Sequence, residues 1–262
     1  MSIEEFKIEI PAEEISNLKT KISLTRWPDE LNTNKWALGT KLDFLRKIVK
    51  HWAKDFDWRK HEKQLNQIGS FKFTTSDGLK IHFLHSKSKN TGAIPLLMTH
   101  GWPGSIQEFI KIIPILNNGV DGISFDVVCP SIPGYGFSDK PKKFGMSSEK
   151  VAPLFHELMI NLGYEKYIAQ GGDWGATIAN WLGYDHFNNC KAIHVNCLTM
   201  RHPDGPQTEE EKKWQKKFDN DQIIQDGYRT QQATKPQTLS YAMLDSPVGI
   251  AAWIIEKMHG WS

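Results

Sequence analysis

Apolar residues in the first part of the chain recur at helical spacing. Ile15, Leu18 and Ile22 lie three and four positions apart, as on the buried face of an amphipathic helix. The same spacing returns further along, at Leu42, Leu45, Ile48, Val49 and Trp52. Between the two sets, the segment Thr25-Arg26-Trp27-Pro28-Asp29 interrupts the pattern at a proline. The pattern therefore predicts a helical N-terminal extension.

The spacing changes from helical to alternating after residue 70. Phe71 and Phe73 occupy every second position of one short segment, and Ile81 and Phe83 do the same in the next. The residues Ser76-Asp77-Gly78 between them are typical of a hairpin turn. These two segments are predicted to form an antiparallel pair of strands.

Short apolar runs then alternate with helical patterns up to residue 195. The runs have the composition of buried parallel strands and lie at residues 94–99, 125–129, 167–170 and 192–195. The helical patterns lie at about 106–116, at 151–162 with Pro153 in its first turn, and at 174–187. Residues 131–136 read as a loop, and the chain from His202 onward is helical and charged. This order predicts an α/β fold with a mostly parallel sheet and right-handed crossovers.

Composition and charge exclude several classes of protein. The chain has 262 residues, 39% of them hydrophobic, and a formal net charge of +2, which gives no reason to expect nucleic acid as a partner. The three cysteines, Cys129, Cys190 and Cys197, are too far apart to form a zinc site, and we expect no metal and no cofactor. A signal peptide and an apolar run of about 20 residues are both lacking, so a soluble, cytoplasmic protein is expected.

The segment Gly171-Gly172-Asp173-Trp174-Gly175 has the form of a nucleophile elbow, with aspartate at the position of the nucleophile. It lies between a predicted strand and a predicted helix, where glycines at Gly171 and Gly175 permit a tight turn. An aspartate is ionised at neutral pH and can attack a saturated carbon without a base. The product is an aspartyl ester, which water must then hydrolyse. Taken alone, the segment could also be an ordinary turn capped by aspartate.

A second motif supports the catalytic interpretation. The loop His100-Gly101-Trp102-Pro103-Gly104-Ser105 directly follows a predicted buried strand. In such folds an oxyanion hole combines the N–H after the nucleophile with an N–H from this loop, which gives Trp174 and Trp102 here. The loop motif precedes the elbow motif in the sequence, and each directly follows a predicted strand, as expected of an oxyanion loop and a nucleophile elbow.

With these motifs the sequence resembles the microsomal-type epoxide hydrolase family of the α/β-hydrolase superfamily. The resemblance begins in an epoxide hydrolase N-terminal region and continues into a helical lid. It is carried by residues 6–11, 25–28, 56–59, 65–66, 100–105, 170–175, 234–238 and 245–249. The resemblance implies three segments: a helical extension with the first strands at 1–95, the first part of the hydrolase core at 96–200, and a partial lid at 201–262.

The resemblance also assigns roles to particular residues. Asp173 would attack an epoxide carbon, and Tyr228 would donate a proton to the epoxide oxygen, giving an alkyl-enzyme ester and then a vicinal diol. The substrate would be a small apolar epoxide, with water as the second reactant, and both xenobiotic detoxification and juvenile-hormone-like signalling substrates stay open. The motif residues that would shape the site are His100, Gly101, Pro103, Gly171, Gly172 and Gly175.

The chain departs from the family pattern at its end. In the family, a second tyrosine, an acid and the catalytic histidine follow the lid, whereas this sequence stops at Ser262. After the strand that follows the elbow helix, where some related enzymes carry the acid, it has Asn196 and Cys197. We therefore expect a fragment that lacks the last strands and the water-activating histidine. Such a chain would keep its ester, would not turn over, and would expose the strand around Ile193 as a sheet edge.

Two other functions are compatible with the same residues. A haloalkane dehalogenase also uses an aspartate nucleophile, and Trp174 could then bind halide. A truncated chain could instead be a non-catalytic binder of apolar ligands. The sequence leaves open the particular epoxide, the oligomeric state and an association with microsomal membranes.

Overall fold

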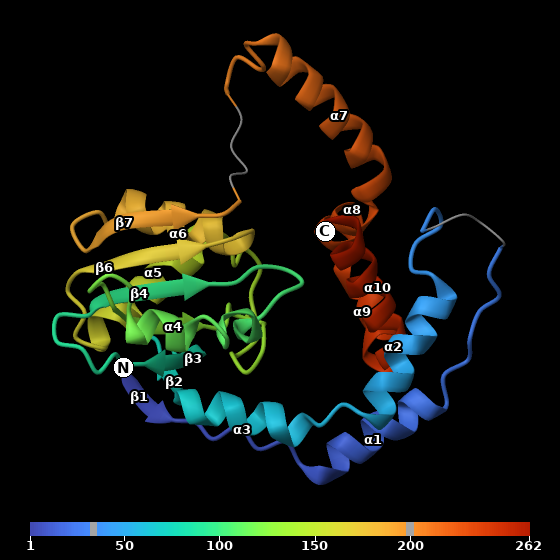
Figure 1. Cartoon of the computed structure of the whole chain (residues 1–262), viewed down its shortest axis with the longest axis horizontal. Helices are drawn as coiled ribbons and strands as arrows, with labels where there is room; N and C mark the ends of the chain where they lie inside the picture. Colours follow the sequence, from blue (N-terminus) through green and yellow to red (C-terminus); the bar gives the residue numbers. More distant parts are fainter. Residues whose placement is uncertain (32–35, 198–201) are drawn as a thin grey trace. The chain divides into compact units, whose positions relative to one another are not determined.

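The computed structural model describes residues 1–31, 36–197 and 202–262 (Figure 1). The chain divides into two compact units, which we call the sheet unit and the helical unit. The sheet unit consists of Met1–Glu9 and Trp58–Met200, and the helical unit of Ile10–Asp57 and Arg201–Ser262. The segment boundary predicted at residues 200 and 201 lies outside the described residues. The helical unit thus combines two parts of the sequence that are far apart.

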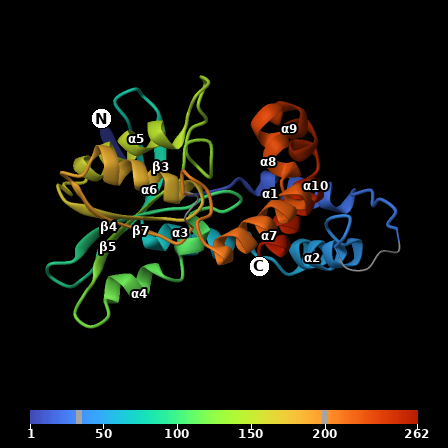
Figure 2. The ribbon, with the colours of Figure 1, turned by 90° about the horizontal axis from the view of Figure 1, so that it is seen from above.

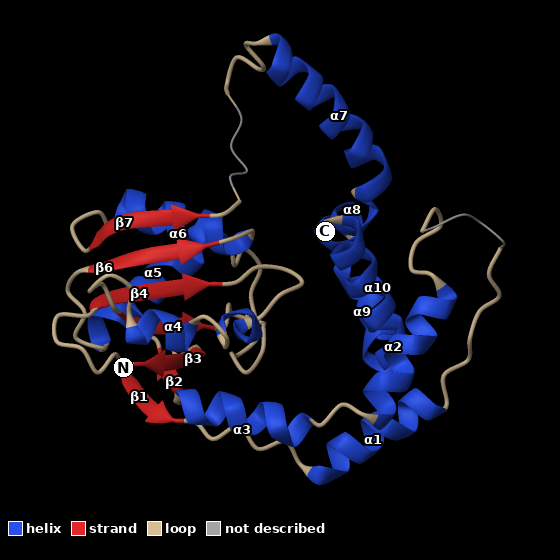
Figure 3. Cartoon of the chain, in the orientation of Figure 1, coloured by secondary structure: helices blue, strands red, loops and turns tan. Residues whose placement is uncertain are grey.

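The sheet unit contains a seven-stranded sheet in its described part, with the strand order β1-β2-β3-β5-β4-β6-β7 (Figure 3). The strands are β1 Ser2–Glu5, β2 Ser70–Thr74, β3 Lys80–Ser86, β4 Ile94–Thr99, β5 Phe125–Pro130, β6 Tyr167–Gly171 and β7 Cys190–Val195. Strands β1, β2, β3 and β5 pair antiparallel, whereas β5, β4, β6 and β7 pair parallel. The predicted hairpin is confirmed, because Phe71 lies opposite Phe83 and Phe73 opposite Ile81.

Helices cover both faces of this sheet (Figure 2). Helices α5 and α6 lie on one face, and α3 and α4 on the other; their bounds are α3 Trp58–Ile68, α4 Ile113–Asn118, α5 Ser148–Asn161 and α6 Trp174–Asp185. Each face has its own apolar core. Phe155, Leu158 and Leu182 are buried in the first core, and Leu65 and Ile113 in the second. The predicted α/β architecture is confirmed, and the layers hold the carboxyl ends of β4 and β6 next to each other.

Three local predictions differ from the structure. Strand β1 was not predicted, because all four of its residues are exposed and show no alternation of burial. The single helix expected over 106–116 is a 3-10 turn, Ile106–Phe109, followed by α4. Pro114 lies in the first turn of α4, where it has no N–H to continue an earlier helix. Helix α5 begins at Ser148, so Pro153 lies inside the helix and not in its first turn.

The helical unit contains the two helices predicted in the N-terminal extension, and both are confirmed. Its helices are α1 Ala12–Ser23, α2 Leu42–Lys54, α7 Glu209–Gln225, α8 Gly227–Thr234, α9 Pro236–Asp245 and α10 Pro247–Gly260. Ile22, Leu45 and Val49 are buried together with Val248 of α10. None of the described helices is both long and apolar enough to cross a membrane.

Strand β7 lies at one end of the described sheet and pairs with β6 on one side. Residues 191–194 of β7 are exposed, and Ile193 has an exposed fraction of 42%.

We expect His82 to make the sheet unit sensitive to acid. This ring is completely buried between the hydroxyls of Ser70 and Ser131, and burial lowers its pKa to about 3. Since an unfolded histidine has a pKa near 6.5, the unfolded chain binds the proton first, and stability falls as the pH drops below that value. At pH 5 the free energy of unfolding should be about 2 kcal/mol lower than at neutral pH because of this one group.

Urea unfolding at pH 7.5 and pH 5 tests this expectation. His82→Gln should lose about 2 kcal/mol of the pH dependence, because glutamine does not titrate. His51→Gln is the matched control, since the His51 side chain is 64% exposed in its pair with Asp55. An unchanged pH dependence in His82→Gln would contradict the assignment.

Candidate active site

The candidate active site begins at the turn between β6 and α6. Strand β6 ends at Gly171 and α6 begins at Trp174, and Asp173 lies between them with φ 53° and ψ −123°. A positive φ at a residue with a side chain is uncommon and costs on the order of 1–3 kcal/mol. The turn therefore has the strained strand-turn-helix geometry of a nucleophile elbow.

The glycines of the elbow allow backbone segments to approach closely. A Cβ atom on Gly171 would lie under 3.0 Å from the backbone of Gly175, and one on Gly175 would lie equally close to the carbonyl oxygen of Thr99. A Cβ atom on Gly172 would collide with the amide oxygen of Asn196. These contacts explain why the turn needs glycine on both sides of Asp173.

The loop after β4 reaches the Asp173 side chain. The N–H of Trp102 donates a hydrogen bond to Oδ1 of Asp173 at 2.8 Å. The Trp102–Pro103 peptide bond is cis, and a Cβ atom on Gly101 would overlap the Asp173 carboxylate. The structure thus brings together the two motifs that the sequence singled out. Trp174 is the first residue of α6, and the role of its N–H in an oxyanion hole stays a prediction.

His100 is a buried, uncharged part of this loop. Its Nδ1 lies 3.1 Å from the carbonyl oxygen of Gly101, and its Nε2 lies 3.2 Å from the N–H of Ile132, from which it accepts a hydrogen bond. Nε2 can accept only when it carries no proton, so Nδ1 is the protonated nitrogen. Burial lowers the pKa of His100, although the Gly101 hydrogen bond and the charge of Asp173 oppose this effect. Because both nitrogens are occupied, the ring supports the loop and is not available as a base.

Sequence reasoning missed two other groups that interact with Asp173. Burial raises the pKa of Tyr135 to about 12, and the negative charge of Asp173 adds to the effect. Burial also raises the pKa of Glu108; the hydrogen bond from the Ser105 N–H opposes this rise, and Asp173 adds to it. Both had a signal in the sequence: Ser105 and Glu108 form a capping box, and Tyr135 lies in the loop after a buried strand.

Tyr228 belongs to the helical unit and is the second residue of α8. Its ring meets that of Trp261 edge to face, with the ring centres 5.2 Å apart. The ammonium of Lys257 lies 5.1 Å from the centre of the Tyr228 ring. The role of Tyr228 as a proton donor stays a prediction.

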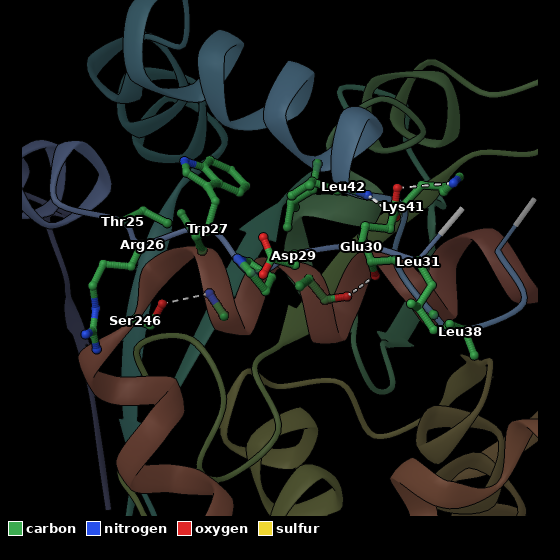
Figure 4. Close-up of a pocket in the computed structure, with 17 residues that line it drawn as sticks. Thr25, Arg26, Trp27, Asp29, Glu30, Leu31, Leu38, Lys41, Leu42 and Ser246 are labelled. Atoms are coloured by element: carbon green, nitrogen blue, oxygen red, sulfur yellow. Dashed lines mark hydrogen bonds and ion pairs between the residues drawn. The ribbon is translucent and has the colours of Figure 1, made fainter. Parts of the chain in front are cut away.

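The helical unit also contains a cavity of about 410 Å³ (Figure 4). The loop from Thr25 to Leu31 and the first residues of α10 line it, and Trp27 lies on its wall. Glu30 crosses one side, accepting hydrogen bonds from Lys41 at 3.2 Å and from the N–H of Leu42 at 2.8 Å. None of the residues that line this cavity is among the predicted catalytic residues.

Two protein-family models match this chain, one over its N-terminal part and one over the part that contains the elbow. The model of the epoxide hydrolase N terminus matches residues 3–109, and the model of the alpha/beta hydrolase fold matches residues 94–246. The second match covers more than half of the chain and includes the elbow and the loop after β4. The fold and the elbow thus define an α/β hydrolase.

Similar proteins are known from animals and a fungus. Epoxide hydrolase 1 of Sus scrofa is 38% identical over 100% of this chain and 63% of its own length. Juvenile hormone epoxide hydrolase 1 of Ctenocephalides felis is 37% identical over 100% of this chain and 61% of its own length. The solved structure of Aspergillus niger epoxide hydrolase has a TM-score of 0.88 and 32% identity, covering 98% of this chain and 69% of its own.

The chain therefore belongs to the epoxide hydrolase family of the α/β-hydrolase superfamily. It spans less than two thirds of the length of the curated animal relatives.

Proposed function

We propose that this chain carries out the ring-opening half of epoxide hydrolysis, with Asp173 as the nucleophile. The observation that carries the proposal is the hydrogen bond from the Trp102 N–H to Oδ1 of Asp173. This bond holds one carboxylate oxygen and leaves Oδ2 to attack. A carboxylate on a strained turn, oriented by a backbone donor, is prepared for displacement at carbon.

In the proposed step, Oδ2 forms a bond to an epoxide carbon, and the carbon–oxygen bond of the ring breaks. The ring oxygen keeps the electron pair of that bond and takes a proton from the Tyr228 hydroxyl. The product is an aspartyl ester that carries a neighbouring hydroxyl group. A proton donor is needed because an alkoxide is a poor leaving group in an apolar pocket.

Oδ1 becomes the carbonyl oxygen of this ester, so the Trp102 N–H already lies where negative charge develops during hydrolysis. When water attacks the ester carbon, the second donor would be the N–H of Trp174. Each such donor contributes on the order of 10²–10³ to the rate. The same hydrogen bond therefore serves both half-reactions.

Hydrolysis of the ester also needs a base to activate water. His100 is next to the elbow, but both of its ring nitrogens are occupied. We therefore expect the 262-residue chain to accumulate the ester and to release little diol. The substrate class is an epoxide, since the relatives are named epoxide hydrolases; a small apolar epoxide is what the resemblance in the sequence implies.

Intact mass spectrometry tests the proposal. The purified chain, incubated with styrene oxide, should gain the mass of one epoxide molecule, and peptide mapping should place the adduct on Asp173. A parallel incubation with a chloroalkane should leave the mass unchanged. No adduct, or an adduct on another residue, would overturn the assignment of the nucleophile, and an adduct from the chloroalkane alone would point to a dehalogenase.

A further inference from the structure

Lys257 of α10 is a buried lysine that the proposed reaction does not yet use. Its exposed fraction is 3%. Its ammonium donates hydrogen bonds to the backbone oxygen of Gln225 at 2.9 Å and to the side-chain Oε1 of the same residue at 3.2 Å. Glu256, which is partly exposed, supplies a carboxylate at 2.9 Å. Burying a charge costs several kcal/mol, so a lysine in this position calls for an explanation.

The partners of Lys257 surround the start of α8. Gln225 is the last residue of α7, and Tyr228 follows three residues later. The ammonium thus binds the end of α7, where exposed carbonyl oxygens favour positive charge, and also lies 5.1 Å from the centre of the Tyr228 ring. Trp261, four residues after Lys257, packs against the same ring. Residues of α10 and its C-terminal end therefore contact both the junction and the tyrosine.

Other contacts hold α8 in place independently of Lys257. The indole N–H of Trp253 donates to Oε1 of Gln232 at 3.0 Å, which joins α10 to α8 at a second point. Within the junction, Nε of Arg229 donates to Asp226 at 2.9 Å. The hydrogen bond between Trp253 and Gln232 thus joins α8 to α10 at a point that does not involve Lys257.

We propose that Lys257 is a positioning residue for Tyr228 and strengthens it as a proton donor. A cation over the face of an aromatic ring is attracted to the ring electrons, and the attraction grows when the phenol oxygen becomes negative. The O–H bond of Tyr228 breaks as the proton moves to the epoxide oxygen, and the phenolate later regains a proton from water. Lys257 stabilises the negative charge during that interval.

The charged groups around the Tyr228 ring determine whether a substitution makes its hydroxyl easier or harder to ionise. Lys257 from α10 and Arg229 from α8 both favour the phenolate, while Glu256 from α10 and Asp226 from the junction disfavour it. Removing Lys257 therefore makes the tyrosine harder to ionise. Removing Glu256 leaves the ammonium without its carboxylate and makes ionisation easier.

Direct titration of Tyr228 tests this inference without any substrate. The tyrosinate absorbance of the chain is measured against pH, and the curve of Tyr228→Phe is subtracted to isolate Tyr228. In Lys257→Met, the transition should move to higher pH by roughly one unit, a tenfold change in proton affinity. In Glu256→Gln, which affects a partly exposed side chain, it should move to lower pH. Lys217→Met, on the exposed surface of α7, is the matched control and should cause no shift.

The rate of ester formation with styrene oxide gives the second readout, and it rests on the proposed function. Lys257→Met should slow the reaction roughly tenfold while its circular dichroism matches that of the unaltered chain. If the unaltered chain forms no ester, the proposed function fails, but the titration still decides the role of Lys257. Unchanged titration and rate in Lys257→Met would overturn the inference. If Lys257→Met does not fold, the Glu256→Gln variant decides the question. A Tyr228 titration in that variant that stays at the pH of the unaltered chain, or moves to higher pH, would overturn the inference.

Discussion

Replacing Asp173 with alanine is expected to abolish covalent capture of an epoxide by this chain, reducing the rate at least about 10³-fold. The carboxylate supplies the attacking oxygen, and no neighbouring group can take its place in the same geometry. Glu108 is held by the N–H of Ser105, and His100 has both nitrogens occupied. The loss should therefore be nearly complete and not a modest slowing.

The rate of adduct formation with styrene oxide, followed by intact mass, measures this effect. Asp185→Ala is the matched control, since Asp185 lies at the exposed end of the same helix and the substitution is identical. The control should react like the unaltered chain. An Asp173→Ala protein that still forms the adduct at a comparable rate would show that another residue is the nucleophile.

Gly175→Ala should destabilise the sheet unit by about 3 kcal/mol or more, because overpacking against backbone leaves little room for relief. The added methyl group would lie under 3.0 Å from the carbonyl oxygens of both Thr99 and His100. These atoms belong to the end of β4 and to the loop that holds Asp173, so the substitution should also displace the Trp102 N–H. A lower stability and a slower alkylation should therefore occur together.

Urea unfolding monitored by circular dichroism measures the loss. Gly227→Ala is the matched control, because a methyl group on Gly227, at the start of α8, would meet nothing within 4 Å. The control should change the unfolding midpoint by little. Equal midpoints for the two variants would mean that the elbow can relax around a side chain at Gly175.

Local patterns were sufficient to predict the strands from β2 to β7 and the elbow. Strands β4 and β5 each end in four consecutive buried residues because both of their faces are covered, and glycines mark the tight turn on either side of Asp173. The hairpin of β2 and β3 was equally predictable from Asp77 and Gly78. In these places the local preference and the final fold agree.

Features that depend on distant contacts could not be predicted in this way. Strand β1 has only exposed residues, and its pairing with β2 is what makes it a strand. The interaction of Tyr135 with Asp173 depends on two loops that follow different strands. The proximity of Trp102 and Asp173 could be predicted, because their motifs follow neighbouring parallel strands. That the Trp102 N–H bonds to Oδ1 of Asp173 could not be predicted from the sequence.

The division of the chain into interleaved units has a consequence for its synthesis. Residues 10–57 leave the ribosome early, yet Val248, against which Ile22, Leu45 and Val49 are buried, is made only after the whole segment Trp58–Met200. The described strands of the sheet unit all precede residue 202, so they can pair with one another in the meantime. Until α10 emerges, the apolar face of the first two helices stays uncovered and is a natural target for chaperones that bind exposed apolar segments.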